Sequence, residues 1–241
     1  RRHTRCADVT GVQTCALPIF LRGRAEFLDP HRLRVHGLDG VASEIRSKTF
    51  LIATGSEISV PPVPGLAEAG YLTSDEMLDL EEIPKSLIVL GAGPVGLEMA
   101  TYCHAFGSEV TVVQRGKRIL SGVDADVAQQ LENALQAEGI EVVTGTGLLH
   151  IERHGARTHV VFEHGDEVKT LEADTVLNAL GRKPCLRGFE ALGLAAEHGR
   201  IVVDSAQRTS QPHIFAAGDV CGGLEVVHIA IQQAEIAAWN A

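Results

Sequence analysis

The 241-residue chain is poor in aromatic side chains and in positive charge. Aromatic residues make up 4% of the sequence, and 21 Lys and Arg stand against 31 Asp and Glu, which gives a formal net charge of −10. A nucleic-acid-binding protein needs a basic surface for the phosphates and aromatic rings on which bases stack, so this composition argues against nucleic acid as a partner. No apolar run reaches the roughly 20 residues that cross a bilayer, so no membrane partner is expected either.

Cysteine is also sparse, and no two cysteines stand in a C-x-x-C pattern. An odd number of scattered cysteines supports neither a disulfide framework nor a zinc site. Free thiols fit a reducing compartment, and the basic start is followed by no apolar region of a signal peptide, so a cytoplasmic location is predicted. What the chain does have is 45% hydrophobic residues, enough for a sizeable core in one or two domains.

Residues 1–19 are excluded from the fold prediction. They show no period of 2 or 3.6 and meet Phe20 without a turn or cap signal. The run VTGVQTCALPI at 9–19 looks like a translated sequencing adapter, and the alternative is an irregular N-terminal arm. The natural start of the protein is therefore expected to be missing.

The next part of the chain, residues 20–83, is predicted to hold strands and a stiff connector. Alternating apolar residues such as Leu33 and Val35, and the run TFLIAT at 49–54, are typical of strands. Three prolines and a glycine at 61–65 form the connector, and an acidic, partly helical passage follows it. These features predict a domain boundary near residues 82–85.

Beyond this boundary, strands and helices alternate, which predicts an α/β fold with a doubly wound parallel sheet. The helix predicted at 123–138 carries Val127, Leu131 and Leu135 on one apolar face. The predicted elements are a strand at 86–90, a helix ending at Phe106, a strand at 109–113, the helix at 123–138, a strand at 140–143, an antiparallel meander at 150–171 and a strand at 175–180; after 184 come short strands at 201–203 and 214–217 and a helix at 224–241.

A glycine-rich turn, GAGPVG at 91–96, joins the first of these strands to its helix. A lone G-x-G-x-x-G is weak evidence, but here a strand precedes it, a helix begins inside it and a second strand follows. Gly91 permits the tight turn, Gly93 lets the backbone approach a pyrophosphate, and Gly96 lets the helix pack closely on the strand. The motif predicts dinucleotide binding at the helix N-terminus, the alternative being an ordinary structural turn.

Gln114 ends the second strand, where an acid usually binds the adenosine ribose. A glutamine does not repel a 2′-phosphate, and the cations Arg115, Lys117 and Arg118 follow it. Gly96 in place of alanine favours NAD, and a solvated basic turn is an equally simple reading of the cations. Taken together, these residues favour NADPH slightly over NADH.

With its flanks, this unit resembles the class I pyridine nucleotide–disulfide oxidoreductases, the family of dihydrolipoamide dehydrogenase, mercuric reductase and glutathione reductase. The resemblance covers residues 20–241. It implies a Rossmann-like NAD(P)-binding domain at 84–184, inserted in a partial FAD-binding domain of the same type at 20–83 and 185–241. The motifs that carry it, in family order, are TFLIATGSE (49–57), YLTSDEMLDLEEIPKSLIVLGAGPVGLEMA (71–100), ALGRKP (179–184) and RTSQPHIFAAGDV (208–220).

The resemblance also assigns cofactor-binding residues. Glu98 would lie near the nicotinamide, although it could be an ordinary ion-pairing residue on a helix surface, and Asp219 could be a simple turn acid. No catalytic residue and no metal ligand is assigned. The residues implied for NAD(P) are Gly91, Ala92, Gly93, Pro94, Val95, Gly96, Glu98, Gln114, Arg115 and Gly181, and those implied for FAD are Ala25, Thr54, Gly55, Ser56, Asp219 and Val227.

The sequence departs from the family pattern at several places. Cys185 replaces the usual Asn, and Ala234 replaces a Gly. The first FAD glycine motif, the C-x-x-x-x-C redox pair, the catalytic His-Glu pair and the C-terminal dimerisation domain are not found, so an internal fragment, inactive alone, is expected.

The family implies that the intact protein, as a homodimer, moves hydride from NAD(P)H to FAD and on to a disulfide or similar small-molecule acceptor. The alternatives are a flavoprotein reductase or oxidase that lacks the redox disulfide, and a nucleotide-binding module without catalysis.

Overall fold

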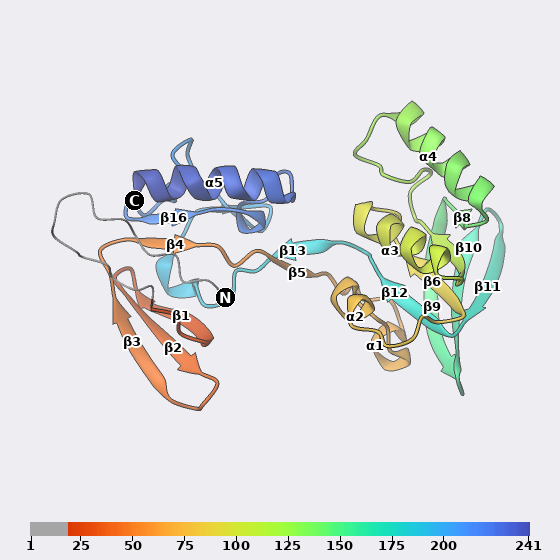
Figure 1. Cartoon of the computed structure of the whole chain (residues 1–241), viewed down its shortest axis with the longest axis horizontal. Coiled ribbons are helices and arrows are strands. Elements are labelled where there is room, and N and C mark those ends of the chain that lie inside the picture. Colours follow the sequence, from red (N-terminus) through yellow and green to blue (C-terminus); the bar gives the residue numbers. More distant parts are fainter. Residues whose placement is uncertain (1–18) are drawn as a thin grey trace. The chain divides into compact units, whose positions relative to one another are not determined.

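The structure is a computed structural model that describes residues 19–241, so the adapter-like run before Ile19 lies outside the described residues. The chain forms two compact units. The central unit is Ser56–Lys183, and the flanking unit combines the described residues up to Gly55 with Pro184–Ala241. Figure 1 shows the elements of both units, each of which is described by itself below.

The central unit contains a parallel sheet of four strands, in the order β12-β6-β7-β8. The carboxyl ends of these strands therefore share one edge. The elements are β6 (Ser86–Leu90), α3 (Pro94–Ala105), β7 (Glu109–Val113), α4 (Ala125–Glu138), β8 (Glu141–Val143) and β12 (Thr175–Asn178). The predicted α/β fold with strand–helix alternation is confirmed.

Alternate side chains of this sheet enter two different cores, which makes the unit three-layered. Leu87, Val89 and Leu177 pack with α3 and α4 on one face. Ile88 and Leu90 pack on the other face against the antiparallel meander β11-β10-β9. Both faces are covered, so the strands are continuous apolar runs, as in SLIVL of β6. The meander strands are β9 (Thr146–His154), β10 (Arg157–His164) and β11 (Glu167–Ala173).

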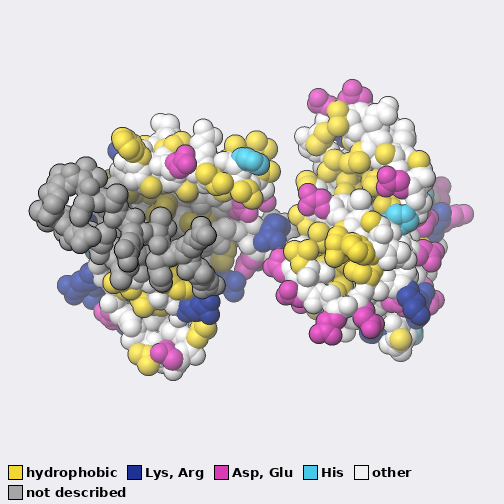
Figure 2. Space-filling model, viewed as in Figure 1, with side chains coloured by type: hydrophobic (Ala, Val, Ile, Leu, Met, Phe, Trp, Pro, Cys, Tyr) yellow, Lys and Arg dark blue, Asp and Glu magenta, His cyan; other side chains and the backbone are white. Residues whose placement is uncertain are grey.

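The ends of the two helices follow the predicted signals, but the buried face of α4 does not. Gly107 (φ 96°) follows α3, and Gly139 (φ 104°) caps α4, both in backbone conformations that favour glycine. Of the predicted apolar face, Leu135 is buried, whereas the prediction was wrong for Val127, which is 53% exposed, and for Leu131, which is 36% exposed. Ala128 is buried together with Leu135, and its small side chain lets the helix approach the sheet closely. Hydrophobic side chains accordingly appear on the surface over α3 and α4 in Figure 2.

The segment between β5 and β6 belongs to the central unit and not to the flanking unit. The helices α1 (Leu66–Ala69) and α2 (Ser74–Leu78) contribute the fully buried Leu66 and Met77 to the two cores. A capping box of Thr73 and Glu76 starts α2. The compact unit thus begins at β5 (Ser56–Ile58), which pairs with β13 (Arg182–Pro184), and not near residues 82–85, where the sequence predicted a boundary.

The flanking unit combines an antiparallel sheet, β1-β2-β3, with a parallel pair, β4 and β16. Its core contains Phe27, Phe50 and Ile214, and the rings of Phe27 and Phe50 meet edge to face at 4.9 Å. No helix within residues 19–241 is long and apolar enough to cross a membrane. The elements are β1 (Gly23–Asp29), β2 (Arg32–Gly37), β3 (Ala42–Arg46), β4 (Phe50–Ile52), η1 (Glu190–Leu192), β14 (Ala196–Glu197), β15 (Arg200–Ile201), β16 (Ile214–Ala216), η2 (Asp219–Cys221) and α5 (Val227–Asn240).

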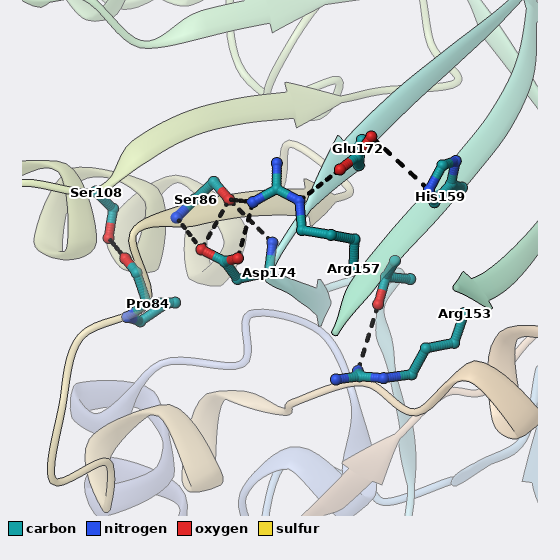
Figure 3. Close-up of polar contacts among 9 residues, drawn as sticks. Pro84, Ser86, Ser108, Arg153, Arg157, His159, Glu172 and Asp174 are labelled. Atoms are coloured by element: carbon teal, nitrogen blue, oxygen red, sulfur yellow. Dashed lines mark hydrogen bonds and ion pairs between the residues drawn. The ribbon is translucent and has the colours of Figure 1, made fainter. Parts of the chain in front are cut away.

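A polar network joins the meander to the amino end of β6 (Figure 3). The Asp174 carboxylate accepts hydrogen bonds from the backbone and hydroxyl of Ser86, at 3.1 and 3.0 Å, and from Arg157 at 2.8 Å. Arg157 also contacts Glu172, at 2.6 Å. The hydrogen bonds from Arg157 and Ser86 hold the pKa of Asp174 below its usual value. The network lies at the amino end of the sheet, away from the carboxyl edge where ligands bind in such folds.

We expect Asp174→Asn to lower the melting temperature near neutral pH and to make the protein less sensitive to acid. The folded protein depresses the pKa of Asp174, so the stabilisation is complete above the unfolded value and is lost as pH falls through the folded value. The difference in Tm between parent and variant should therefore be constant above about pH 5 and should shrink below it. A difference that is independent of pH down to acid unfolding would contradict this assignment.

Candidate functional site

The glycine turn lies at the carboxyl end of β6, and its three glycines meet different surroundings. Gly91 has φ 103°, and a side chain there would run into the carbonyl of Ala179. A side chain at Gly96 would run into the carbonyl of Gly91, so the start of α3 packs directly on the turn. A Cβ at Gly93 would meet nothing within 4 Å. Gly91 and Gly96 are thus required by the chain's own packing, whereas Gly93 leaves open space beside a helix N-terminus.

This open space belongs to a pocket of about 670 Å³ in the central unit. Its volume lies within the range of small-molecule sites, about 300–1,000 Å³. Gly93, which lines the pocket, is the N-cap of α3, so the pocket adjoins a helix N-terminus, where unpaired N–H groups and the helix dipole favour an anion. The lining residues are Pro61, Val63, Gly91, Ala92, Gly93, Val113, Gln114, Arg115, Gly116, Ser121, Thr146, Gly147, Leu148, Ala179, Leu180 and Gly181.

The structure places Gln114 directly after β7 and against the glycine turn. Its side-chain oxygen accepts a hydrogen bond from the backbone N–H of Ala92 at 3.1 Å, and its amide nitrogen donates to the carbonyl of Arg118 at 3.4 Å. Gln114 therefore braces the turn as well as lining the pocket. Arg115 lines the same pocket, and Arg118 donates to the carbonyl of Ser121 at 3.2 Å.

The remaining predicted residues of the central unit lie around the same turn. Pro94 and Val95 form the first, exposed turn of α3. Glu98 is exposed on α3 and forms no ion pair with any residue in the described range 19–241. Gly181, with φ 118°, lines the pocket, and its carbonyl accepts from the backbone of Ser59 at 2.9 Å.

In the flanking unit, two segments that carry predicted FAD-binding residues lie at the same edge of the parallel pair of strands. β4 and β16 run parallel, with Ile52 opposite Ala216, so the chain leaves both strands on the same side. Thr54 and Gly55 follow β4, and Asp219 follows β16 at the start of η2. The carboxyl ends of parallel strands are where open α/β sheets bind ligands.

Local contacts fix this edge. The Thr54 hydroxyl donates to the carbonyl of Cys185 at 2.8 Å, and the Cys185 N–H donates to the carbonyl of Gly55 at 3.0 Å. Gly55 has φ 65°, and a Cβ there would meet nothing within 4 Å. A bound group could therefore approach the backbone closely at this edge, because the glycine has no side chain in the way.

The other three predicted FAD residues have separate positions. Ala25 lies in β1, and its carbonyl packs against the open face of Gly188. Ser56 begins β5 in the central unit, where its hydroxyl accepts from Arg182 at 2.8 Å. Val227 is 70% exposed at the start of α5.

Comparison with known protein families shows which family the chain belongs to. The family model described as pyridine nucleotide-disulphide oxidoreductase matches residues 19–234. The chain belongs to this family.

Several curated relatives of this chain are named by their activity. A mercuric reductase from Staphylococcus aureus is 35% identical over 224 residues, which cover 92% of this chain and 40% of the relative. A dihydrolipoamide dehydrogenase from Chaetomium thermophilum is 38% identical over 223 residues, which cover 89% of this chain and 44% of the relative. The chain thus spans less than half the length of these relatives.

Solved structures of the family have the same fold. The HOCl-induced flavoprotein disulfide reductase RclA from Escherichia coli matches with a TM-score of 0.80 and 33% identity, over 88% of this chain and 48% of that one. An FAD-dependent pyridine nucleotide-disulphide oxidoreductase from Desulfovibrio vulgaris matches with a TM-score of 0.78 and 26% identity, over 88% of this chain and 59% of that one. The Rossmann-like architecture is therefore confirmed.

The three cysteines of the described region are free thiols. Burial raises the pKa of Cys103, and it raises the pKa of Cys221 to about 11. A thiol must ionise to act as a nucleophile, so these two are structural at neutral pH. Cys6 and Cys15 lie outside the described residues.

The sequence prediction missed more than half of the residues that line the pocket. Thr146, Gly147 and Leu148 begin β9 after the end of β8, and Ala179 and Leu180 follow the end of β12. These residues stand beyond the carboxyl ends of parallel strands. The rule that ligands bind at this edge would have identified them, had it been applied to every strand rather than to the first two.

Proposed function

We propose that the whole protein is an FAD-dependent oxidoreductase that uses NAD(P)H to reduce a disulfide or similar small-molecule acceptor. FAD, when bound, would supply the hydride- and electron-transfer chemistry of the reaction. The residues of this chain bind and orient the two cofactors. Family membership supports the proposal, and so do the names of relatives such as mercuric reductase and flavoprotein disulfide reductase.

The observation that carries the proposal is the glycine turn beside the 670 Å³ pocket. The residues present fit a pyridine nucleotide, because Gly93 leaves free the space that a pyrophosphate needs, and the N–H groups of α3 favour its charge. In the proposal, Gly91, Ala92, Gly93 and Gly96 form the phosphate-binding turn. Pro94, Val95, Glu98 and Gly181 border the nicotinamide half.

The flanking unit is proposed to hold part of the FAD. Thr54, Gly55 and Asp219 fit this group, since they meet at the carboxyl edge of β4 and β16, and Gly55 leaves its Cβ space open. The Asp219 carboxylate would accept a hydrogen bond from a flavin hydroxyl. Ala25 and Val227 would complete the part of the site that this unit contributes.

The nucleotide is proposed to be NADPH rather than NADH. Gln114 presents no negative charge where an acid would repel a 2′-phosphate, and Arg115 lines the pocket next to it. Within the described residues, Arg115 forms no ion pair that would compete for its guanidinium. Arginine suits phosphate because it offers several donors in a fixed plane.

Gln114→Glu is expected to weaken NADPH binding several-fold and to leave NADH binding equal or tighter. A glutamate keeps the oxygen that accepts from the N–H of Ala92, so the turn should hold its shape while the added charge repels the 2′-phosphate. An exposed charge pair is worth roughly 1 kcal/mol, so the change should be several-fold, and larger at low salt. Isothermal titration calorimetry with both nucleotides checks this. Equal effects on the two nucleotides would place Gln114 away from the ribose.

Partners and location complete the proposal. By family resemblance the whole protein is a homodimer, and the free thiols of the described region suit a reducing, cytoplasmic compartment.

The function is tested by assaying the whole protein after purification. We expect it to carry one FAD per chain and to oxidise NAD(P)H steadily when a disulfide substrate is supplied. Nucleotide binding without flavin or turnover would instead indicate a non-catalytic binding protein, and turnover with oxygen alone would indicate a flavoprotein oxidase.

A further inference from the structure

A second concave site lies in the flanking unit, at the end of the β1-β2-β3 sheet where β1 turns into β2. The pocket has a volume of about 840 Å³ and is lined by residues 29–32 of the β1–β2 turn and by residues 46–48 after β3. Ala25, the predicted FAD contact, lies nearer the opposite end of β1, where it pairs with Val35. The glycine-turn pocket belongs to the other unit. No cofactor residue proposed above lines this pocket.

Cross-strand rows on the polar face of this sheet show how charges are normally balanced here. In one row, Arg34 of β2 stands between Glu26 of β1 and Glu44 of β3. Its guanidinium reaches Glu44 at 2.9 Å and Glu26 at 3.9 Å. One cation between two carboxylates is the arrangement that cross-strand pairing favours.

The next row, at the pocket, breaks this pattern. Arg32 of β2 pairs with Asp29 of β1 at 2.5 Å, but its partner on β3 is Arg46 rather than an acid. Like charges directly opposite one another on neighbouring strands destabilise a sheet. Lys48 follows two residues after Arg46 and lines the same pocket. Within residues 19–241, neither Arg46 nor Lys48 forms an ion pair, so the pocket carries three cations against one carboxylate.

Pro30 and His31, which line the pocket, are held in place by histidine contacts. The rings of His31 and His213 stack with centroids 4.2 Å apart and planes 18° apart. His213 Nε2 lies 2.8 Å from the carbonyl of Pro30, and the backbone N–H of Ser47 donates to the carbonyl of His31 at 3.3 Å. Asp29 accepts from Arg32 and from the backbone of His31, so its charge is already engaged. These contacts therefore fix the backbone segments that carry the excess of cationic side chains.

We propose that this pocket binds a small soluble anion of the phosphate-ester class, held by Arg46 and Lys48 and backed by Arg32. A phosphate satisfies the cation that the cross-strand row leaves without an acid, and arginine can bind it through two parallel hydrogen bonds. A pocket of this volume suits a small molecule. In a chain with a net charge of −10, such a local excess of cations stands out from the rest of the composition.

The test uses two-dimensional ¹H–¹⁵N NMR of the chain titrated with inorganic pyrophosphate, because this measurement locates the binding. The backbone amides of residues 29–32 and 46–48 should shift and saturate, separately from amides of the glycine turn. Arg46→Ala should weaken this binding about tenfold, the cost of losing a charge-assisted contact. The matched control is Arg24→Ala, which removes an exposed arginine from the other end of the same sheet and should leave the response unchanged.

Several outcomes would overturn the proposal. They are an absence of shifts at these amides, the same response in Arg46→Ala as in the parent, or binding only to an acidic peptide. Binding only to vesicles that carry a phosphorylated lipid would also exclude a soluble ligand. None of these results bears on the glycine turn, whose own amides report on the proposed nucleotide site in the same spectra.

Discussion

Replacing Gly93 by valine is expected to abolish dinucleotide binding while the protein stays folded. The Cβ of residue 93 would enter the pocket beside α3 and touch no other part of the chain, so folding should not oppose it. A valine would keep the pyrophosphate from the N–H groups of the helix. Losing two charge-assisted hydrogen bonds, at about 1.5 kcal/mol each, weakens binding by about a hundredfold or more. Calorimetric titration with NADH and NADPH measures the loss, and the melting temperature reports on the fold.

The chain offers a matched control in Gly122. This glycine also has an ordinary φ and open space around its Cβ position, but it is not among the residues that line the pocket. Gly122→Val should leave both affinity and melting temperature nearly unchanged. If Gly93→Val bound both nucleotides as the parent does, the turn would have only a structural role.

Gly96→Val, unlike Gly93→Val, is expected to cause a large loss of stability. The added Cβ would collide with the carbonyl of Gly91 and would lie 3.2 Å from the Cβ of Ala179, so α3 would have to move away from the sheet. Overpacking of this kind costs about 3 kcal/mol or more when backbone atoms must shift. For a chain of this size that corresponds to a Tm lower by about 6 °C or more.

Denaturant unfolding of Gly96→Val beside Gly122→Val separates packing from the general effect of adding a valine to a loop. A Gly96→Val protein with parental stability would mean that α3 does not rest on the turn in the way described.

The parts of the site that follow from local chemistry could be predicted from the sequence. The spacing of Gly91, Gly93 and Gly96 after a buried strand fixes a tight turn, an open approach and a close contact, and the structure has all three features at these positions. Gly139 ends α4 in a left-handed conformation for an equally local reason. Each of these features depends on a few neighbouring residues, so the pattern alone is sufficient.

Features that depend on distant residues could not be predicted in the same way. The rotation of α4, which buries Ala128 and exposes Val127, is set by how closely the helix can approach the sheet. The start of the central unit at Ser56 depends on backbone bonds such as those of Leu72 with Val176 and Asn178, at 2.8 and 2.9 Å. Residues far apart in the chain make these contacts, and no local sequence pattern predicts them.

The cation excess at Arg46 is a third example of a feature hidden from local patterns. It becomes visible only when the strand register places Arg46 opposite Arg32. In the sequence the two arginines belong to separate strands with no sign of pairing.

The most direct test of the proposed function is rapid mixing of the FAD-loaded whole protein with NAD(P)H in the absence of oxygen. We expect the absorbance of the oxidised flavin to bleach after mixing with the parent protein and to persist in Gly93→Val at the same nucleotide concentration. This result would tie hydride transfer to the glycine turn of the central unit. A flavin that stays oxidised in the parent, or that bleaches equally in both proteins, would contradict the account.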